Sequence, residues 1–600
     1  MGPNQYNVWD FLIFINTPMK SSQLEKIRHS LSHLLAMAVL EKFPQAKLAI
    51  GPTIENGFYY DFDLAEKINV EALPALEKKM KALIKQNLAF VQSNETPDTA
   101  KKTMSRQPYK LELIDELVNN KAELSFYRSG DFIDLCSGPH VAATKEINPD
   151  SFKLIAVAGA YWRGDEKKQQ LQRIYGVAFA TKAELDAYLT QQAEALKRDH
   201  RKIGQELDLF TISPLVGSGL PMYTPRGVIM FRAITGLLNE LETAYGYEFV
   251  DIPHLGKIDL YKTSGHWDKY KDSIFTVKGH GEDFVLKPMN CPHHMQIYAS
   301  RPRSWRDLPV RYSEVTKQYR DEKAGELLGL SRVRSISIDD NHIFCRPDQL
   351  QDEMEHAYQI IKKFSGVFGF EHMIRLSIRD PKKKASYLGD DATWAKAEKE
   401  LVKLLDRLGE KYVIGEGEAS FYAPKIDFIQ KDSLGRSWQL STIQLDFVEP
   451  ERFHLEYADD QGNKTRPAIL HIAVAGSLER FLSIMIEHYA GAFPVWLSPV
   501  QVQLIPVGTR HEAACQKLAR EFTALGIRTN VDMLNETVGN KIRKALKTKV
   551  PYLLVIGDKE AKSSKLHIRR RGDEAIQLQP KKQFTSQLLK EISERLPWTS

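Results

Sequence analysis

The sequence predicts an α+β protein built from several domains. The chain has 600 residues, and a soft prior of about 100 to 200 residues per domain gives three to five domains. Between Leu209 and Trp496, short β-rich runs alternate with helices and hairpin-like turns, which favours an antiparallel sheet with flanking helices. After residue 498 the runs follow a βαβα order, which indicates a small α/β domain with a mixed sheet.

Composition and charge place few limits on function. Hydrophobic residues make up 42% of the chain and charged residues 27%, as in ordinary globular proteins. The 83 Lys and Arg against 77 Asp and Glu leave a net charge of +6, which alone does not indicate a nucleic-acid partner. The excess gathers near the C-terminus, in residues 541–549 and 565–571, and so permits such a partner there.

Cysteine usage and hydropathy indicate a reducing compartment. The four cysteines, at positions 136, 291, 345 and 515, are widely spaced and do not form a disulfide pattern. No apolar run approaches the roughly 20 residues that span a bilayer. Residues 1–20 include the apolar VWDFLIFIN, which follows no basic segment and precedes no cleavage site, so we interpret them as a leader without signal function. We expect a cytoplasmic protein without a membrane partner.

A helix with two histidines opens the first predicted domain, residues 21–182. Its apolar residues recur at three- and four-residue spacing, so His29 and His33 project from one helical face. In DLCSGPH, Cys136 and His140 flank a Gly-Pro turn that can carry both side chains to one point. The four residues suit either a zinc site or a water-activating hydrolytic pocket, and spacing does not separate the two. Two histidines of the core are the structural alternative.

Residues 183–205 predict a connecting helix with a solvated charged face, because they lack Gly and Pro before Gly204.

The next domain, residues 206–497, contains neither GxxxxGK[ST] nor a convincing GxGxxG loop, so side chains must hold any ATP. The arginines of RYSEVTKQYRDEKAG suit that task, because a guanidinium fork matches phosphate oxygens. We predict strand, loop, strand from YRDE to SRVRSIS, with Arg320 and Glu322 on one face.

Three residues of this domain suit a metal ion. Cys291 in MNCPHHM, His342 in DDNHIF and His471 in ILHIAVAGS offer one thiolate and two imidazoles. Such a set with an open fourth position is typical of a catalytic zinc site. His293 and His294 compete for the same role, and spacing alone leaves the choice open.

Several motifs, in order, resemble the threonyl-tRNA synthetases, a family of class II aminoacyl-tRNA synthetases, over about residues 22 to 600. RHSLSHLLAMAV, AIGPTIENGFYYDFDL, LCSGPH, GAYWRGD and LQRIYGVAF resemble the editing domain of the family, shared with an alanyl-tRNA synthetase module. The resemblance implies hydrolysis of mischarged Ser-tRNA(Thr) without a metal. It implies that His29, His33, Cys136 and His140 position water and the ester, supported by Tyr60, Lys110 and Asp134.

The middle domain resembles the class II catalytic domain through its three motifs. EFVDIPHL supplies the proline of motif 1 as Pro253, RYSEVTKQYRDE with SRVRSIS resembles motif 2, and AGSLERFLSIMIEHYAG resembles motif 3. The implied ATP contacts are Arg320 at the α-phosphate, Glu322 at the adenine, Arg332 on the phosphate tail, Gln439, and Arg480 at the γ-phosphate. FYAPKIDF adds Lys425 near the reacting phosphate. In-line attack by the threonine carboxylate would rest on positioning and charge, with Arg320, Lys425 and Arg480 as catalytic residues and Mg²⁺ bound with ATP.

The resemblance also selects metal ligands and a threonine pocket. It implies Zn²⁺ on Cys291, His342 and His471, beside Met289, Asp340, Tyr422 and Gln444. A zinc that ligates the β-hydroxyl rejects valine, whereas serine lacks only a methyl group, worth roughly 1 to 3 kcal/mol. Because binding alone does not exclude serine, a second, hydrolytic site is expected.

The last predicted domain, residues 498–600, resembles the class II anticodon-binding domain. The resemblance implies that Asn535, Glu560 and Arg569 contact anticodon bases, which are unstacked and readable in a single-stranded loop. Phosphate contacts from Lys541, Arg543 and Lys544 would make binding salt-sensitive, and a merely solvated basic surface is the alternative. Motif 1 usually forms a homodimer interface in this class, so a homodimer is expected.

The sequence departs from the family at several positions. Ser137 stands where bacterial members often carry Arg, and the additional small β-rich N-terminal domain of many members is expected to be missing. Ile338 replaces a usual Gln, Ala423 a usual Gly, and Leu440 with Ser441 a usual Cys-Gly. The Gln is expected to help hold the threonine carboxylate. We therefore predict weakened threonine binding with intact specificity, unless a donor such as Arg320 takes over that role.

These expectations combine into ATP-dependent ligation of L-threonine to tRNA(Thr) through threonyl-adenylate, with hydrolytic editing of Ser-tRNA(Thr). A hydrolase that has lost ligation is one alternative, motivated by Ile338. An RNA-binding regulator is another. The presence of Arg320, Glu322, Arg480 and the three zinc candidates counts against both.

Overall fold

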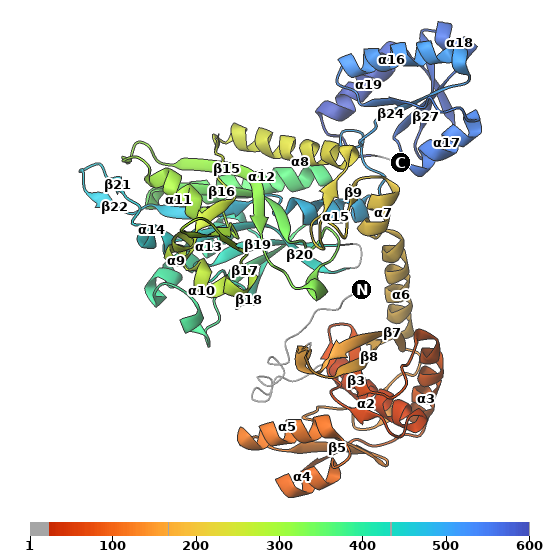
Figure 1. Ribbon diagram of the computed structural model, residues 1–600, viewed down its shortest axis with the longest axis vertical. Helices are drawn as coiled ribbons and strands as arrows, with labels where there is room; N and C mark the ends of the chain where they lie inside the picture. The colour runs from red at the N-terminus through yellow and green to blue at the C-terminus, as the bar shows by residue number, and fades with distance from the viewer. Residues whose placement is uncertain (1–22, 166, 433–434, 599–600) are drawn as a thin grey trace. The chain divides into compact units, whose positions relative to one another are not determined.

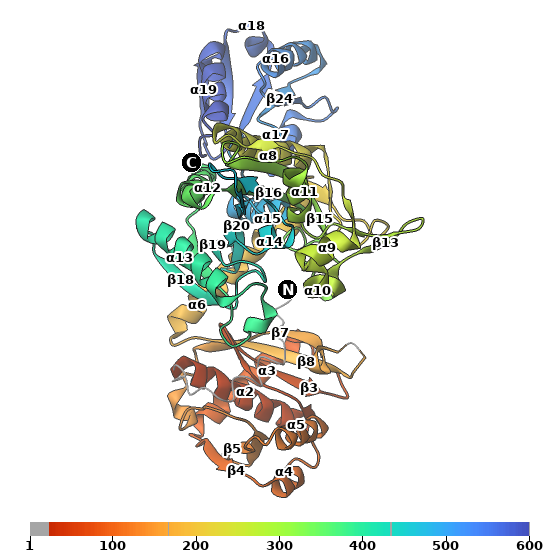
Figure 2. The same ribbon diagram turned by 90° about the vertical axis from the view of Figure 1, so that its left-hand side faces the viewer.

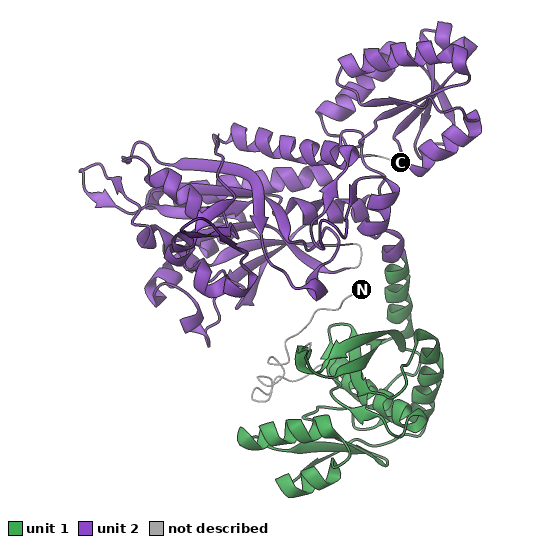
Figure 3. Ribbon diagram, viewed as in Figure 1, with its two compact units in different colours: residues 1–193 green, residues 194–600 purple. Residues whose placement is uncertain are grey.

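The computed structural model describes residues 23–165, 167–432 and 435–598 (Figures 1 and 2). The chain divides into two compact units, residues 1–193 and 194–600, which are described separately (Figure 3). The expected leader, residues 1–20, lies outside the described residues. Within the described ranges, no helix combines the length and apolar character needed to cross a membrane.

The long helix α2 (Gln23–Lys42) packs against a five-stranded antiparallel sheet in unit 1. The sheet has the order β1-β3-β8-β7, with β2 paired to β3. The helix contacts β3, β8 and α3, and half of its residues are buried. This explains why its apolar residues surround the helix rather than form one stripe. The predicted helix with His29 and His33 on one face is confirmed.

A second, three-stranded antiparallel sheet, β4-β5-β6, lies in unit 1 with the helices α4 and α5. Ala100, Met104 and Ile114 from these helices share a small core with Leu124 and Phe126. The strands of the two sheets are β1 (Lys47–Leu48), β2 (Thr53–Ile54), β3 (Gly57–Asp63), β4 (Val91–Asn94), β5 (Ser125–Ser129), β6 (Phe132–Leu135), β7 (Phe152–Tyr161) and β8 (Gln170–Ala178), and the helices beside them are α3 (Leu73–Lys85), α4 (Pro97–Thr103) and α5 (Pro108–Asn119). Cys136 follows β6 directly, and Lys110 lies on α5.

The predicted connecting helix is two helices, α6 (Lys182–Lys197) and α7 (His200–Glu206). The break falls at Asp199, whose side chain caps α7 by accepting the Arg201 N–H at 2.8 Å. The expected solvated face concerned the charged residues of this segment; His200, by contrast, is buried, with 1% of its surface exposed.

An eight-stranded, mainly antiparallel sheet forms the body of unit 2, in the order β11-β15-β16-β23-β20-β19-β17-β18. The predicted antiparallel sheet with flanking helices is therefore confirmed. Helix α12 contacts α8 and the strands β16, β20 and β23, and α13 contacts β17, β19 and β20 (Figures 1 and 2). The strands are β11 (Glu248–Phe249), β15 (Val310–Tyr319), β16 (Ser335–Cys345), β17 (Met373–Ile378), β18 (Tyr412–Glu416), β19 (Lys425–Lys431), β20 (Ser437–Asp446) and β23 (Ala468–Ala473).

Helices and small sheets cover this large sheet. The helices are α8 (Pro225–Ala244), α9 (Ile258–Ser264), α10 (His266–Tyr270), α11 (Cys291–Ala299), α12 (Leu350–Phe368), α13 (Asp391–Leu408), α14 (Glu449–Arg452) and α15 (Leu478–His488). The small sheets contain β9 (Phe210–Thr211) with β10 (Met222–Tyr223), β12 (Leu255–Lys257) with β14 (Asp283–Leu286) and β13 (Thr276–Lys278), and β21 (Tyr457–Ala458) with β22 (Lys464–Thr465).

The expected strand, loop, strand order around Arg320 is confirmed, but the strand bounds and the shared face of Arg320 and Glu322 need correction. Strand β15 ends at Tyr319 and β16 begins at Ser335, so Arg320, Glu322 and Arg332 lie on the connection. The chain leaves the ladder because the Glu322 N–H turns back to the Arg320 carbonyl at 2.9 Å. Strand alternation therefore does not place Arg320 and Glu322 on one face.

A five-stranded mixed sheet, β25-β24-β26-β27-β28, forms the C-terminal part of unit 2. The first three strands are parallel and the remaining pairs antiparallel, which confirms the predicted mixed α/β order. The elements are β24 (Val502–Pro506), α16 (Glu512–Ala524), β25 (Thr529–Val531), α17 (Val538–Lys547), β26 (Tyr552–Ile556), α18 (Asp558–Lys562), β27 (Lys565–Arg570), β28 (Ile576–Pro580) and α19 (Lys581–Ser593).

Candidate functional site

The fold brings Cys291, His342 and His471 together in unit 2. Cys291 begins α11, and His342 on β16 pairs directly with His471 on β23. Their ligand atoms lie within 4.8 Å of one another, and all three residues are buried. Burial lowers the pKa of His342 well below its usual range, so this imidazole is neutral, which is the state that binds metals. We call these three residues the core cluster.

Asp446 fixes which nitrogen of His471 faces the core cluster. The Oδ1 atom of Asp446 accepts the backbone N–H groups of Val448 and Glu449, at 2.6 and 3.0 Å. Its Oδ2 atom lies 3.1 Å from His471 Nε2. A carboxylate only accepts, so Nε2 carries the proton and Nδ1 presents a lone pair toward His342.

Glu314 and His294 do the same for His342. Glu314 Oε2 lies 3.4 Å from His294 Nε2, and His294 Nδ1 lies 2.8 Å from His342 Nδ1. The carboxylate places the proton of His294 on Nε2, so its Nδ1 accepts the Nδ1–H of His342. The lone pair of His342 Nε2 then faces that of His471 Nδ1 across 3.0 Å. Two facing lone pairs beside a thiol fit a bound cation, and one thiolate with two imidazoles suits Zn²⁺.

The side chains expected to contact threonine surround this cluster. Asp340 is 7% exposed and accepts from Asn290 Nδ2 at 2.9 Å and from Gln318 Nε2 at 3.2 Å. Gln444 lies opposite His471 in the sheet and accepts the Tyr422 hydroxyl at 3.2 Å.

The expected ATP residues contact one another or the threonine residues in small groups. Met289 Sδ accepts from Arg320 at 3.3 Å, which brings the threonine and ATP groups together. Arg332 forms an ion pair with Glu322 at 2.7 Å. Gln439 accepts from Lys425 Nζ at 3.0 Å through its side chain and from Arg480 Nη1 at 3.3 Å through its carbonyl.

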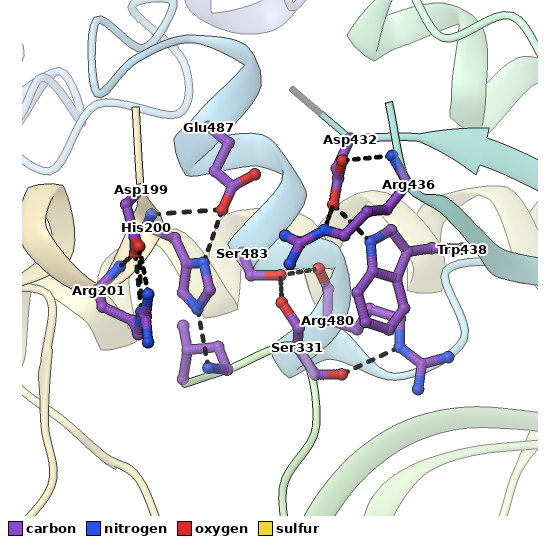
Figure 4. A network of polar contacts seen from close by, with 11 residues as sticks. Asp199, His200, Arg201, Ser331, Asp432, Arg436, Trp438, Arg480, Ser483 and Glu487 are labelled. Atoms are coloured by element: carbon purple, nitrogen blue, oxygen red, sulfur yellow. Dashed lines mark hydrogen bonds and ion pairs between the residues drawn. The ribbon is translucent and has the colours of Figure 1, made fainter. Parts of the chain in front are cut away.

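Arg480 lies beside the ring of Trp438, with its guanidinium 5.0 Å from the ring centroid (Figure 4). Burial, with Arg320 and Arg332 nearby, lowers the pKa of Arg480 to about 10. The side chain therefore stays cationic at neutral pH. The guanidinium groups of Arg320 and Arg332 near that of Arg480 favour an anionic ligand such as a polyphosphate.

Ile338 lies on β16 opposite Thr316 and forms an isolated bridge with Ser477. An isoleucine side chain offers no hydrogen-bond donor at this point of the ATP and threonine face. Ala423 and Leu440 are buried, and Ser441 Oγ donates to the Val474 carbonyl. These three departures are thus absorbed into packing.

A second thiol–imidazole group lies in unit 1 and consists of His29, His33, Cys136 and His140. Its ligand atoms also lie within 4.8 Å of one another. Cys136 Sγ is 3.2 Å from His29 Nε2 and 3.3 Å from His140 Nε2. The sharp turn between Cys136 and His140 needs Gly138, because φ is +67° and a Cβ there would lie 2.3 Å from the Tyr127 hydroxyl. We call these four residues the unit 1 cluster.

The unit 1 cluster is neutral. Burial lowers the pKa of His29 to about 4 and raises the pKa of Cys136 to about 12. Ser30 Oγ lies 2.8 Å from the Lys26 carbonyl, to which it donates, and 3.1 Å from His140 Nδ1. It therefore accepts from His140 Nδ1, and the Nε2 atom of His140 presents a lone pair to the thiol.

A pocket of about 120 Å³ opens beside these residues, lined among others by His29, His33, Lys110, Asp134 and Ser137. Asp134 accepts the Tyr60 hydroxyl at 2.5 Å and pairs with Lys110 Nζ at 2.6 Å. Within the described part of the chain, His33 Nδ1 is buried without a hydrogen-bond partner. A polar pocket with an unsatisfied nitrogen can hold water and a polar substrate.

The three expected anticodon residues lie on separate elements: Asn535 between β25 and α17, Glu560 on α18, and Arg569 on β27. Glu560 accepts the Gly557 N–H at 3.0 Å and pairs with His567 at 2.8 Å.

The expected contact of Lys541 with RNA phosphates is wrong. This lysine is 5% exposed and donates to the Asp532 carbonyl at 2.9 Å, so it is not available to phosphates.

Sequence reasoning missed Asp446, Glu314 and His294 as partners of the metal candidates, and His200 altogether. Asp446 could have been found from the sequence, because strand alternation places its side chain on the same face as that of Gln444, two residues earlier. His200 and Glu487 are 287 positions apart in the sequence, which no local pattern connects.

Three family profiles match the chain. Residues 275–489 match the tRNA synthetase class II core domain (G, H, P, S and T). Residues 501–591 match an anticodon binding domain, and residues 124–175 match the threonyl and alanyl tRNA synthetase second additional domain.

Curated relatives match nearly the whole chain. A threonine–tRNA ligase of Gloeobacter violaceus is 47% identical over 559 residues, which cover 92% of this chain and 89% of that protein. One from Synechococcus elongatus is 45% identical, covering 96% of this chain and 97% of the relative.

A solved structure is also similar. The RNA binding domain of threonyl-tRNA synthetase from Cryptosporidium parvum superimposes with a TM-score of 0.63 at 33% identity, covering 67% of this chain and 99% of that one.

Proposed function

The chain belongs to the threonyl-tRNA synthetase family, and we infer from this membership that it is a threonine–tRNA ligase. It uses ATP and L-threonine to make threonyl-adenylate and then transfers threonine to tRNA(Thr). As a class II synthetase, it takes ATP with Mg²⁺. The observation that carries the proposal is the contact of Arg320 with Met289, which joins the arginines to the residues around the thiol–imidazole cluster.

Adenylate formation then rests on positioning. We propose that Arg320 holds the α-phosphate, that Arg480 and Arg332 hold the far phosphates, and that Glu322 and Gln439 complete the ATP contacts. Lys425 lies beside Gln439 and would offset charge on the phosphorus as the threonine carboxylate attacks in line. No side chain forms a covalent intermediate.

Cys291, His342 and His471 are the residues we propose for one Zn²⁺ per chain. When bound, the metal would supply a Lewis-acid position that recognises the threonine β-hydroxyl. Asp340 would accept that hydroxyl, while Met289, Tyr422 and Gln444 line the pocket. Valine then lacks the recognised group, whereas serine keeps it, so discrimination against serine needs the second site.

The unit 1 cluster is proposed to hydrolyse Ser-tRNA(Thr). Its imidazoles are neutral and can accept a proton from water, and His33 Nδ1 is free to hold a polar atom of the substrate. Lys110, Tyr60 and Asp134 support one edge of the pocket.

The remaining assignments follow the family. We propose an editing domain at residues 21–182, a connector at 183–205, a catalytic domain at 206–497 and an anticodon-binding domain at 498–600. Asn535, Glu560 and Arg569 would read anticodon bases. A homodimer and a cytoplasmic location are part of the same proposal.

Threonine-dependent ATP/pyrophosphate exchange, run beside serine and valine, tests ligation. We expect strong exchange with threonine, weaker exchange with serine and none above background with valine. No exchange with threonine, together with cleavage of Ser-tRNA, would favour a hydrolase that has lost ligation. Neither activity would leave an RNA-binding regulator.

A further inference from the structure

His200 of the connector reaches the loop that carries the ATP arginines. It is 1% exposed and lies at the start of α7. Its Nδ1 atom is 2.8 Å from Glu487 Oε1 on α15, and its Nε2 atom is 3.1 Å from the backbone nitrogen of Leu330 (Figure 4). One imidazole ring thus joins the connector, the motif 3 helix and the loop between β15 and β16.

The two contacts fix the tautomer of this ring. The Leu330 N–H donates, so Nε2 must be the unprotonated nitrogen. The Glu487 carboxylate accepts, so Nδ1 carries the proton. With both nitrogens engaged, His200 is not a free metal ligand, although the ligand atoms of Asp199, His200 and Glu487 lie within 4.8 Å of one another.

The backbone of the loop between β15 and β16 approaches His200 closely at Gly329. Gly329 precedes Leu330 with φ +51°, and a Cβ at that position would lie 2.3 Å from His200 Nε2. The ring therefore abuts the loop backbone directly. Only glycine allows this approach, because both the space and the positive φ exclude a side chain.

The next residue, Ser331, connects the same loop to Arg480. The Ser331 carbonyl accepts from Arg480 Nε at 3.1 Å, and its hydroxyl lies 2.9 Å from the hydroxyl of Ser483 (Figure 4). Arg332 follows immediately. Residues 329–331 are thus held by α7 on one side and α15 on the other, between two proposed phosphate-binding arginines.

We propose that His200 is a positioning residue for the ATP subsite, which clamps Leu330 to Glu487 so that Arg332 and Arg480 converge on the phosphates. This inference rests on the proposed roles of those two arginines. The clamp is needed because like charges repel, and Arg320, Arg332 and Arg480 must stay close before ATP arrives.

The experiment separates the two contacts of the ring. An asparagine amide can reproduce the Nδ1 donor toward Glu487 but not the Nε2 acceptor, whereas a glutamine can place an acceptor near Leu330. We compare His200→Ala, His200→Asn, His200→Gln and Glu487→Gln. Lys202→Ala is the matched control, because Lys202 is an exposed residue of the same helix. The readouts are KM for ATP, KM for threonine and kcat in pyrophosphate exchange, direct ATP binding by calorimetry, and Tm.

We expect His200→Ala and His200→Asn to raise KM and Kd for ATP about tenfold, while KM for threonine changes less than about twofold. ATP binding by His200→Gln should weaken less. ATP binding by Glu487→Gln should stay near the wild-type value, because the glutamine oxygen still accepts the Nδ1–H of His200. Unchanged ATP binding with a lower Tm would overturn the positioning role. Equal losses for ATP and threonine, or in Lys202→Ala, would also overturn it.

Failure of the proposed function has a different signature. It appears in the wild type, as absent threonine-dependent exchange, or as full exchange in Arg480→Ala. Direct ATP binding still decides the role of His200 in either case.

Discussion

Two thiol–imidazole clusters of nearly the same composition lie in the two units of this chain. The core cluster has one cysteine and two histidines, and the unit 1 cluster has one cysteine and three histidines, each with its ligand atoms within 4.8 Å. Residue type alone does not distinguish them. What differs is the second layer of hydrogen bonds.

In the core cluster, carboxylates stand behind both imidazoles. Asp446 directs His471, and Glu314 directs His342 through His294, so two lone pairs face one point. In the unit 1 cluster, His140 instead donates to a serine hydroxyl, and its ring stacks on Phe90 at 4.8 Å. A neutral partner adds little basicity, and an open pocket lies alongside. The comparison supports the proposal of a cation site in unit 2 and of a water or substrate site in unit 1.

Removing a core ligand should have the largest effect. We expect Cys291→Ala to reduce threonine-dependent pyrophosphate exchange to background, because the threonine hydroxyl loses its recognition site. Cys345→Ala is the control, since Cys345 is buried on the same strand as His342 but outside the cluster. Near-normal exchange in Cys291→Ala would remove the core cluster from threonine recognition.

Removing the unit 1 thiol should break editing alone. We expect Cys136→Ala to slow hydrolysis of Ser-tRNA(Thr) about a hundredfold or more while exchange with threonine is unchanged. The measurement is deacylation of preformed Ser-tRNA, with Cys515→Ala as a control in the core of the C-terminal sheet. A parallel loss of exchange would mean that the two clusters are not functionally separate.

Replacing a residue that hydrogen-bonds to a core ligand should have a smaller but measurable effect on zinc affinity. Replacing Asp446 with Ala removes the acceptor of His471 Nε2, so zinc affinity should fall about 10- to 100-fold. Competition with a chelator measures this affinity, and Asp460→Ala is an exposed control. Equal zinc affinity in both variants would show that Asp446 does not orient the ligand.

Replacing Ile338 should strengthen threonine binding rather than weaken it. Ile338→Gln restores a donor for the threonine carboxylate, and a hydrogen bond to a charged group should lower KM for threonine up to about tenfold. The preference for threonine over valine should not change. A normal threonine KM in the wild type that Ile338→Gln leaves unaltered would refute the idea.

The smallest expected effect is that of pH on editing. The pKa of His29 is lowered from 6.5 to about 4, so this imidazole remains the neutral base above about pH 5. The thiol of Cys136, with its pKa raised to about 12, does not titrate either. Between about pH 7.5 and 5.5 the deacylation rate should change less than about twofold. If the histidine kept its usual pKa, the rate would fall about tenfold over the same range. A decline with a midpoint near 6.5 would contradict the buried, neutral cluster.

Periodicity and motif order predicted the helix of His29 and His33, the antiparallel sheet and the mixed C-terminal sheet. These features depend on local patterns that strands and helices must follow. The prediction that the strand continues past Tyr319 was wrong. A single turn at Arg320 ends the strand, although no Gly or Pro stands there to indicate it.

The contacts of Asp446, Glu314 and His200 depend on which strands, helices and loops become neighbours, and a single sequence does not give that information. The placement of His342 beside His471, for example, follows from the pairing of β16 with β23 across 129 positions.

Metal analysis of purified protein tests the contrast between the clusters most directly. We expect about one zinc per chain in the wild type and in Cys136→Ala/His140→Ala, and almost none in Cys291→Ala/His471→Ala. Zinc retained in the core variant, or lost with the unit 1 variant, would contradict the assignment of the metal to the core cluster.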